Sequence, residues 1–318
     1  MAQFGTPTYD QLQVFLAVVE AGSFAAAARR LGRATSVVSY AIANLETQLG
    51  VALFDRTQSK TPKLTEAGRT VLAEARTIAS GMDGLRAKVK GLLEGLEAEV
   101  HVALDVMLPA ARVVDALKAF SEAFPTVTLR LYVEALGAVA EMVLNGRAVI
   151  GVSGALPVMA PALEHIDIGF VDLIPVAAPD HPLALAGHNP PGAGRDHVQL
   201  VLTDRSRLTE GVEFAVLGNR TWRLADIGSK HMLLREGIGW GNLPEPMVRE
   251  DLAAGRLVRL DLPDLRGGRY HLQAIYRADT PPGPAGSWLI QRLQAQACSE
   301  ARQSAGTDAD RDLSPPPA

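Results

Sequence analysis

The stretch from residue 9 to residue 65 constrains the fold most, because it places three short helical patterns and a basic hairpin within fewer than sixty residues. Thr8 precedes the first pattern, and its hydroxyl can accept from the free N–H groups of a helix start. Gly22 ends that pattern, and Ser23 caps a second helix that ends at Gly32. The second helix carries four alanines, whose small side chains let another helix cross it closely.

A third helix is predicted to open at Thr35 and Ser36 and to stop at Gly50. Its apolar residues share one face: Val38, Ile42, Leu45 and Leu49. Its other side presents Ser36, Ser39, Tyr40 and Ala43. The chain then shows a short strand, VALF, a polar and basic turn, and a return strand over residues 63–65. This order predicts a winged helix-turn-helix.

A helix with one apolar face and one short, hydrogen-bonding face suits insertion into the major groove of DNA. The basic residues of the segment supply the charge that phosphates require: Arg29, Arg30, Arg33, Arg56, Lys60 and Lys63. The alternative is a small helical bundle whose arginines are only a solvated face.

Three runs, AGSFAAAARRL, VVSYAIANLETQLGVALFDR and KLTEAG, resemble the N-terminal domain of LysR-type transcriptional regulators, and the likeness continues to the C-terminus. Two features depart from the family: Ala34 and Thr35 replace the usual Ser-Gln pair, and Tyr40 replaces a common Arg. The resemblance and the charge pattern together give the predicted DNA contacts as Ser23, Arg33, Thr35, Ser36, Ser39, Tyr40, Arg56, Lys60 and Lys63. Thr and Ser pair with several base edges, so no operator sequence follows.

The net charge of −4 is unevenly divided along the chain. Residues 1–95 contain 11 Lys+Arg and 8 Asp+Glu, an excess of +3, and the remaining residues carry −7. The positive excess lies in the expected DNA-reading part. Because it is small, we expect binding to use more than one copy of that part per site.

Length and composition bound the remaining possibilities. A chain of 318 residues with 47% hydrophobic content holds two or more domains with real cores. The first residues show no export signal and no apolar run is long enough to span a membrane, so we expect a cytoplasmic protein without a membrane partner. The single cysteine, Cys298, excludes an internal disulfide and a multi-cysteine zinc site. It is interpreted as a bystander, with a redox switch as the alternative.

Residues 66–97 are predicted to form a long linker helix, because apolar residues recur at intervals of three and four. Gly81 and Gly84 weaken its middle and would mark a bend. The alternative is a core helix of the following domain. In the resembled family this helix pairs two chains antiparallel, which implies a homodimer that assembles to a homotetramer.

From residue 98 strands alternate with helices, a rhythm that predicts parallel sheets covered by helices. The expected fold class is α/β: a winged helix-turn-helix, a linker helix and, by resemblance, a two-lobed periplasmic-binding-protein-like effector domain. The predicted domains are 1–65 for DNA binding, 66–97 for the linker, 98–298 for the effector domain, and 299–318 as a disordered tail. Within the effector domain, residues 98–168 and 264–298 form the first lobe, and residues 169–263 form the second.

Strand ends that face a cleft between such lobes are candidate ligand positions. The predicted effector contacts are Asp105, Val106, Met107, Leu136, Ser153, Gly154, Thr203, Asp204, Arg205 and Asp226. An acidic Asp105 would repel an anion, so the hypothesis is a neutral or hydroxylated co-inducer, with aromatic compounds among the candidates. As alternatives, Asp105 caps the helix after Pro109 or pairs with an arginine, and Arg205 or Arg207 supplies a partner for an anion.

No catalytic or cofactor signature stands out. The seven histidines are scattered, which makes a metal site improbable, and GIGWGNLP lacks the full glycine spacing of a phosphate loop. No glycine-flanked nucleophilic serine occurs, so no enzyme activity and no cofactor are expected. The leading interpretation is an effector-modulated transcriptional regulator. The competing one is a cytosolic solute-binding protein of the same two-lobed fold without a gene-regulatory role.

Overall fold

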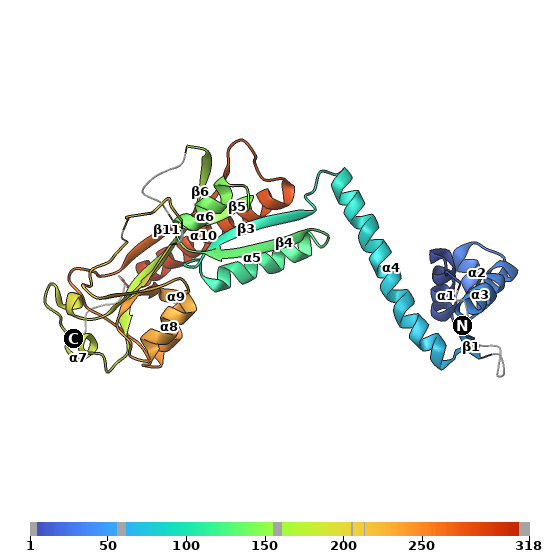
Figure 1. Ribbon diagram of the computed structural model, residues 1–318, viewed down its shortest axis with the longest axis horizontal. Helices are drawn as coiled ribbons and strands as arrows, with labels where there is room; N and C mark the ends of the chain where they lie inside the picture. The colour runs from blue at the N-terminus through green and yellow to red at the C-terminus, as the bar shows by residue number, and fades with distance from the viewer. Residues whose placement is uncertain (1–4, 56–61, 155–160, 205, 213, 312–318) are drawn as a thin grey trace. The chain divides into compact units, whose positions relative to one another are not determined.

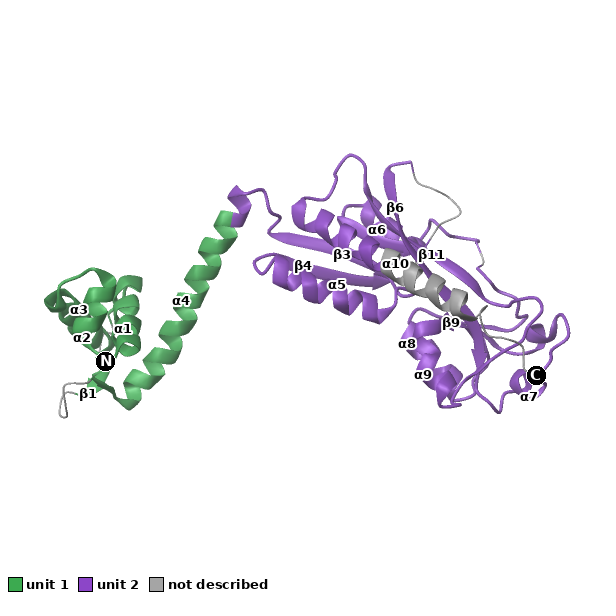
Figure 2. Ribbon diagram, turned by 180° about the vertical axis from the view of Figure 1, so that it is seen from behind, with its two compact units in different colours: residues 1–90 green, residues 91–318 purple. Residues whose placement is uncertain are grey.

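The computed structural model describes residues 5–55, 62–154, 161–204, 206–212 and 214–311, with side chains to residue 297. The chain divides into two compact units, residues 1–90 and 91–318, coloured green and purple in Figure 2. Each unit is described by itself.

The first unit holds three helices, a short hairpin and most of a long helix (Figure 1). Its elements are α1 (Tyr9–Ala21), α2 (Phe24–Leu31), α3 (Thr35–Leu49), β1 (Phe54–Asp55), β2 (Lys63–Leu64) and α4 (Glu66–Leu93). Thr8 forms a capping box with Gln11, and Ser23 accepts from Ala26 N. Gly22, Gly32 and Gly50 end the three helices in the left-handed conformation.

One hydrophobic cluster holds the three helices to the hairpin. Phe54 meets the rings of both Phe15 and Phe24 edge-on, with centroids 5.5 Å apart in each pair. Glu46 accepts from Leu53 N (2.7 Å) and Phe54 N (3.3 Å), which fixes the chain as it leaves α3. The strand predicted over residues 51–54 is shorter in the structure, where β1 begins only at Phe54. The backbone amides of Leu53 and Phe54 donate to Glu46 and not to a partner strand.

The long helix α4 runs without interruption through Gly81 and Gly84, where the sequence predicted a bend. It ends at Leu93, four residues before the predicted end of the linker. Gly95 then takes a positive φ of 82°, and Leu96 packs on the core of the second unit.

The second unit is built on one large mixed sheet. The strands of the unit are β3 (Glu99–Asp105), β4 (Thr128–Glu134), β5 (Ile150–Gly154), β6 (Leu163–Ala177), β7 (Gln199–Leu202), β8 (Thr221–Leu224), β9 (Gly241–Pro244), β10 (Val258–Arg259) and β11 (Gly268–Arg277). Its helices are α5 (Ala110–Ala123), α6 (Gly137–Leu144), α7 (Pro182–Leu185), α8 (Ile227–Arg235), α9 (Glu245–Ala253) and α10 (Pro284–Arg311), with a 3-10 turn at Ala193–Asp196.

The sheet has the strand order β10-β6-β11-β5-β3-β4, with β9 also paired to β6. Only β3, β4 and β5 pair parallel in it, and β7 pairs parallel with β8 in a separate two-stranded sheet. The expectation of parallel sheets alone was therefore wrong. Strands β6 and β11 pair antiparallel over most of their length, and the lobe boundary predicted at residue 169 falls inside β6.

Separate hydrophobic clusters lie at the two ends of this unit. Near β3 and β5 the core includes α5 and α10, where Phe120, Phe124 and Trp288 pack ring to ring. Around β7 and β9 a second cluster joins Leu200 and Leu243 to α8 and α9. These two cores fit the predicted two-lobed arrangement.

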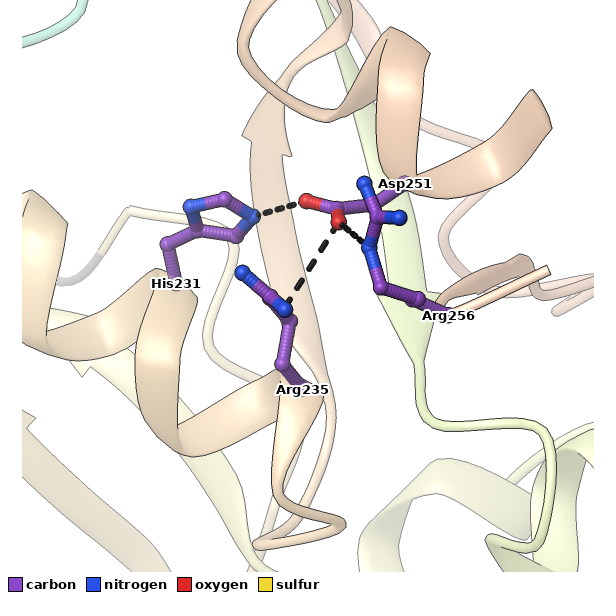
Figure 3. A network of polar contacts seen from close by, with 4 residues as sticks. All are labelled: His231, Arg235, Asp251 and Arg256. Atoms are coloured by element: carbon purple, nitrogen blue, oxygen red, sulfur yellow. Dashed lines mark hydrogen bonds and ion pairs between the residues drawn. The ribbon is translucent and has the colours of Figure 1, made fainter. Parts of the chain in front are cut away.

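A polar network locks α8 to α9 beside the second core (Figure 3). Asp251, whose side chain is 5% exposed, lies 2.6 Å from His231 Nε2 and 3.6 Å from Arg235 Nε, and also pairs with Arg256. The carboxylate of Asp251 on α9 thus joins two basic side chains of α8 to one in the turn after α9.

The backbone of α10 continues to Arg311, where the sequence predicted a disordered tail from residue 299. A helix nucleated by packing of its first turns gains one hydrogen bond for each further residue, which explains the extension. The side chain of Cys298 lies outside those described.

Candidate functional site

The exposed face of α3 is the polar surface that the sequence predicted. Thr35, Ser36 and Ser39 are exposed, and Tyr40 is 69% exposed. On the opposite face Val38 and Leu45 are fully buried. The apolar stripe thus anchors the helix and leaves three hydroxyls and a phenol free of the core.

Two of the predicted DNA contacts have partners inside the unit. The hydroxyl of Ser23 accepts from Ala26 N (3.1 Å) as the cap of α2. The guanidinium of Arg33 forms a two-pronged pair with Asp10, at 2.9 and 2.6 Å, and this bond lowers the pKa of the Asp10 carboxyl. The pair is open to solvent, with the side chains of Arg33 and Asp10 36% and 55% exposed.

The hairpin after α3 is described only at its two ends. Lys63 on β2 is exposed and lies opposite Asp55 in the β1–β2 register. Arg56 and Lys60 lie outside the described residues.

A chamber of about 350 Å³ lies within the second unit, bounded by the ends of β3 and β4 and by β7 and β9. Four predicted effector residues line it: Asp105, Val106, Met107 and Leu136. Further lining residues are Ala135, Leu173, Gln199, Leu200, Val201, Leu202, Phe214, Ala215, Lys230, Asn242 and Tyr270. Most of these side chains are apolar, as in small-molecule sites generally.

Asp105 organises one end of the chamber. Its carboxylate is 2% exposed and accepts from Met107 N (2.8 Å), Leu136 N (3.2 Å) and Tyr270 Oη (2.8 Å). Burial raises the pKa of Asp105 despite these bonds, and burial beside this carboxylate raises the pKa of Tyr270 too. Neither sequence alternative holds, because α5 is capped by Pro109 and no arginine among the described residues pairs with Asp105.

A second, polar chamber of about 400 Å³ shares the walls Leu136, Val201, Leu202 and Phe214 with the first. It contains Thr203 and Asp204 from the predicted set, together with Arg207, Arg223 and other residues of the segment after β7. Asp204 accepts from Gly137 N (2.7 Å), Ser206 N (2.7 Å), and the hydroxyls of Ser206 and Thr209. Its carboxylate therefore caps α6 from the other end of the unit.

Three predicted effector residues do not line either chamber. Ser153 is 1% exposed and donates to Gly154 O (2.9 Å), and a Cβ on Gly154 would collide with Tyr270, so β5 lies behind that ring. Asp226 caps α8 by accepting from Ser229 N (2.6 Å), which directs its carboxylate to the helix start. The structure therefore does not bring these three residues to either chamber. Arg205 lies outside the described residues.

Four polar lining residues were not predicted from the sequence: Lys230, Tyr270, Gln199 and Asn242. Each is far from Asp105 in the sequence, and only the tertiary fold brings these side chains to the same chamber. A lysine within an ordinary helical pattern gives no signal of burial, yet Lys230 is 4% exposed.

Two family models match this chain. Residues 9–69 match the bacterial regulatory helix-turn-helix protein, lysR family, and residues 93–298 match the LysR substrate binding domain. The chain belongs to the LysR family of transcriptional regulators. It is thus a DNA-binding regulator whose second domain binds a small-molecule effector between two α/β lobes.

Relatives and solved structures share this organisation along most of their length. The regulator AceR of Acinetobacter baumannii is 26% identical over 287 residues, covering 90% of this chain and 96% of AceR. The activator AllS of Klebsiella pneumoniae is 29% identical over 254 residues, covering 78% and 93%.

Two structures from Corynebacterium glutamicum show the same fold. A peroxide-bound mutant of OxyR has a TM-score of 0.52 at 22% identity, covering 96% of this chain and 98% of that one. LysG with bound arginine has a TM-score of 0.51 at 21% identity, covering 92% and 98%.

The described residues contain no group of three or more His, Cys, Asp or Glu side chains placed to hold a metal ion. None of their helices is long and apolar enough to cross a membrane.

Proposed function

We propose that this regulator reads double-stranded promoter or operator DNA with the exposed side of α3, through Thr35, Ser36, Ser39 and Tyr40. The observation that carries this is the division of α3 into a fully buried stripe and an exposed hydroxyl-bearing side. Hydroxyls and a phenol can bond base edges or phosphates.

Cationic side chains around α3 would position the helix on the phosphates. Lys63 on β2 and Arg33, once released from Asp10, lie in the same unit, and Arg56 and Lys60 are assigned the same role from the sequence. Ser23 supports this role indirectly, because it fixes the start of α2.

A gel shift with DNA from upstream of the protein's own gene tests this function. The double variant S36A/S39A should lose roughly tenfold or more in specific affinity, because two hydrogen bonds to the DNA disappear. The matched control is Thr47→Ala on the same helix, whose hydroxyl is exposed but bonds only to Ala43 O (2.8 Å). Equal losses in the two variants, or no salt-sensitive binding by the wild type, would contradict the proposal.

We infer that the effector occupies the chamber of about 350 Å³ between Asp105 and Lys230. Its mainly apolar walls suit a compact effector with an aromatic or aliphatic body. Residues from both ends of the unit line it, so a bound molecule would favour one relative arrangement of the two lobes and shift the population toward it.

We propose that two copies associate through α4 and that the dimers assemble to a homotetramer in the cytoplasm, where the DNA lies. Apolar side chains of α4 recur on one exposed stripe: Ile78, Leu85, Val89 and Leu92. Each is between 47% and 56% exposed, and a contiguous exposed apolar stripe of this kind is typical of a surface that binds another protein.

A further inference from the structure

The polar groups that line the effector chamber differ in how fully the protein uses them. Asp105 and Tyr270 bond to each other, and Asp105 receives two backbone amides besides. The side-chain oxygen of Gln199 accepts from Leu217 N and Gly218 N, both at 2.8 Å, and its nitrogen donates to Ala215 O (2.8 Å). These three side chains have little hydrogen-bonding capacity left for a ligand.

Two other groups in the chamber retain unused hydrogen-bonding capacity. The ammonium of Lys230 donates to Asn242 O (2.7 Å), which leaves two of its three N–H groups without a partner among the described residues. The side-chain oxygen of Asn242 is buried and likewise has no hydrogen-bond partner in the described part of the chain. No carboxylate among the described residues pairs with Lys230.

The fold holds Lys230 in this position. A Cβ on Gly241 would lie 3.0 Å from Cε and 3.4 Å from Nζ of Lys230, so the glycine of β9 leaves room for the side chain. The ammonium therefore reaches the chamber along β9, next to Asn242. Burial lowers the pKa of Lys230 to about 8, so the group is still mainly cationic at neutral pH.

A buried cation without a counter-charge is unfavourable, and an anion that reaches it restores the lost solvation. We propose that the effector of this chamber is a compact organic acid whose carboxylate binds Lys230 and the side-chain amide of Asn242. The side-chain nitrogen of Asn242 donates to the second carboxylate oxygen.

The apolar body of the acid would fill the rest of the chamber, between Met107, Leu173, Leu200, Leu202 and Phe214. A volume of about 350 Å³ is near the lower end of the roughly 300–1,000 Å³ usual for small-molecule sites, which favours a single ring or a short chain.

This inference replaces the expectation of a neutral effector, which depended on repulsion by Asp105. The oxygens of Asp105 already receive three donors, including the hydroxyl of Tyr270, and these donors offset its charge. The cation and the unpartnered amide lie together on α8 and β9, so the anionic end of a ligand has a defined place.

A thermal-shift screen of the full-length protein with matched acid and amide pairs tests the inference, which rests on the proposed function. The probes are benzoate with benzamide, phenylacetate with phenylacetamide, and hexanoate with hexanamide. At least one acid should raise the melting temperature, and by more than its amide does, because only the acid pairs with Lys230. Amides that stabilise as well as their acids, or no stabilisation by any acid, would overturn the inference.

Two variants assign the effect to the chamber. Lys230→Met keeps the length and the apolar stem, and should weaken binding of the active acid at least about tenfold by isothermal titration. Lys118→Met, an exposed position of α5 in the same unit, should leave the affinity unchanged. If K230M unfolds, Asn242→Ala provides the second variant, with a smaller loss expected.

The gel shift separates this inference from the proposed function. If the wild type binds its DNA and an amide alters that binding while the acids do not, the acid class is wrong and the regulator function stands. If the wild type fails to bind DNA, the proposed function fails whatever the acids do.

Discussion

Two carboxylates from distant parts of the chain hold the first turn of α6. Asp105 accepts from Leu136 N and Asp204 accepts from Gly137 N, at 3.2 and 2.7 Å. Leu136 between them has a φ of 48° and a ψ of −123°, a positive-φ conformation that is uncommon for leucine. Such strain persists only where surrounding contacts fix the backbone, and here the two carboxylates do so. Leu136 is also one of the four residues that line both chambers.

Gly154→Ala tests the packing behind the effector chamber. The added Cβ would overlap the ring and hydroxyl of Tyr270 and push it from Asp105. We expect the free energy of unfolding in urea to fall by about 1–3 kcal/mol, because overpacking and a lost buried hydrogen bond combine. Gly268→Ala on β11 is the control, since nothing lies within 4 Å of its Cβ position. A variant as stable as this control would show that Tyr270 adapts freely.

Individual site residues could be predicted only where residues nearby in the sequence indicate their position. Asp105 was identified because it ends a buried strand, but its role depends on Tyr270, 165 residues further along. Lys230 was missed, since its burial arises from α8 packing against other elements. The hydroxyls on α3 were predicted from periodicity, because a helix with a buried stripe must expose the other side.

Asp251 on α9 contacts side chains of α8, an element that does not precede α9 directly in the sequence (Figure 3). Titration of its carboxyl group should affect unfolding in acid. Burial raises the pKa of Asp251, but bonds with Arg256 and His231 and the charge of Arg235 lower it below the ordinary value. A carboxyl with a lowered folded pKa stabilises the protein above its unfolded pKa of about 4. This contribution is lost as the pH falls below that value.

The variant Asp251→Asn should therefore unfold more easily than the wild type at pH 7, by about 1–3 kcal/mol, because its charge-assisted bonds are lost. The difference should shrink as the pH is lowered from 5 toward 2, measured by urea unfolding at each pH. Asp279→Asn serves as the control, because Asp279 pairs with Arg277 at an exposed position. A constant difference across this range would mean that the carboxyl charge of Asp251 is not what stabilises α8 and α9.

Among the elements, local signals gave the helix boundaries of the first unit. Thr8, Ser23 and the glycines at the helix ends act through neighbouring residues, so they can be recognised without a fold. The length of β6 could not be recognised in this way. Its 15 residues continue past Gly169 because β11 supplies a partner along the strand, and that pairing is a long-range contact.

The whole molecule divides its charge between an N-terminal part, residues 1–95, and the rest of the chain. Residues 1–95 carry an excess of only three positive charges, which supports weak phosphate binding by one copy. Two copies on one DNA double the number of contacts and raise the effective concentration of the second reading domain. Association and DNA affinity should therefore be lost together.

The double variant L85E/L92E tests that link. Charges on the exposed apolar stripe of α4 should prevent copies from pairing, so sedimentation should show monomers, and specific DNA affinity should fall at least about tenfold. Ala87→Glu is the control, because Ala87 is exposed on the opposite side of the same helix. If L85E/L92E still sediments as the wild type does, a different surface mediates association.

The paired strands β6 and β11 give the effector domain a mechanical property. They pair from Leu163 to Leu173, with a register shift between His271 and Gln273, and join the two cores without a loop between them. We expect relative motion of the lobes to twist this ribbon, and a twisted ribbon stores elastic energy. The domain would then behave as a torsion spring, which returns to its resting angle when the effector leaves and needs no second signal to reset.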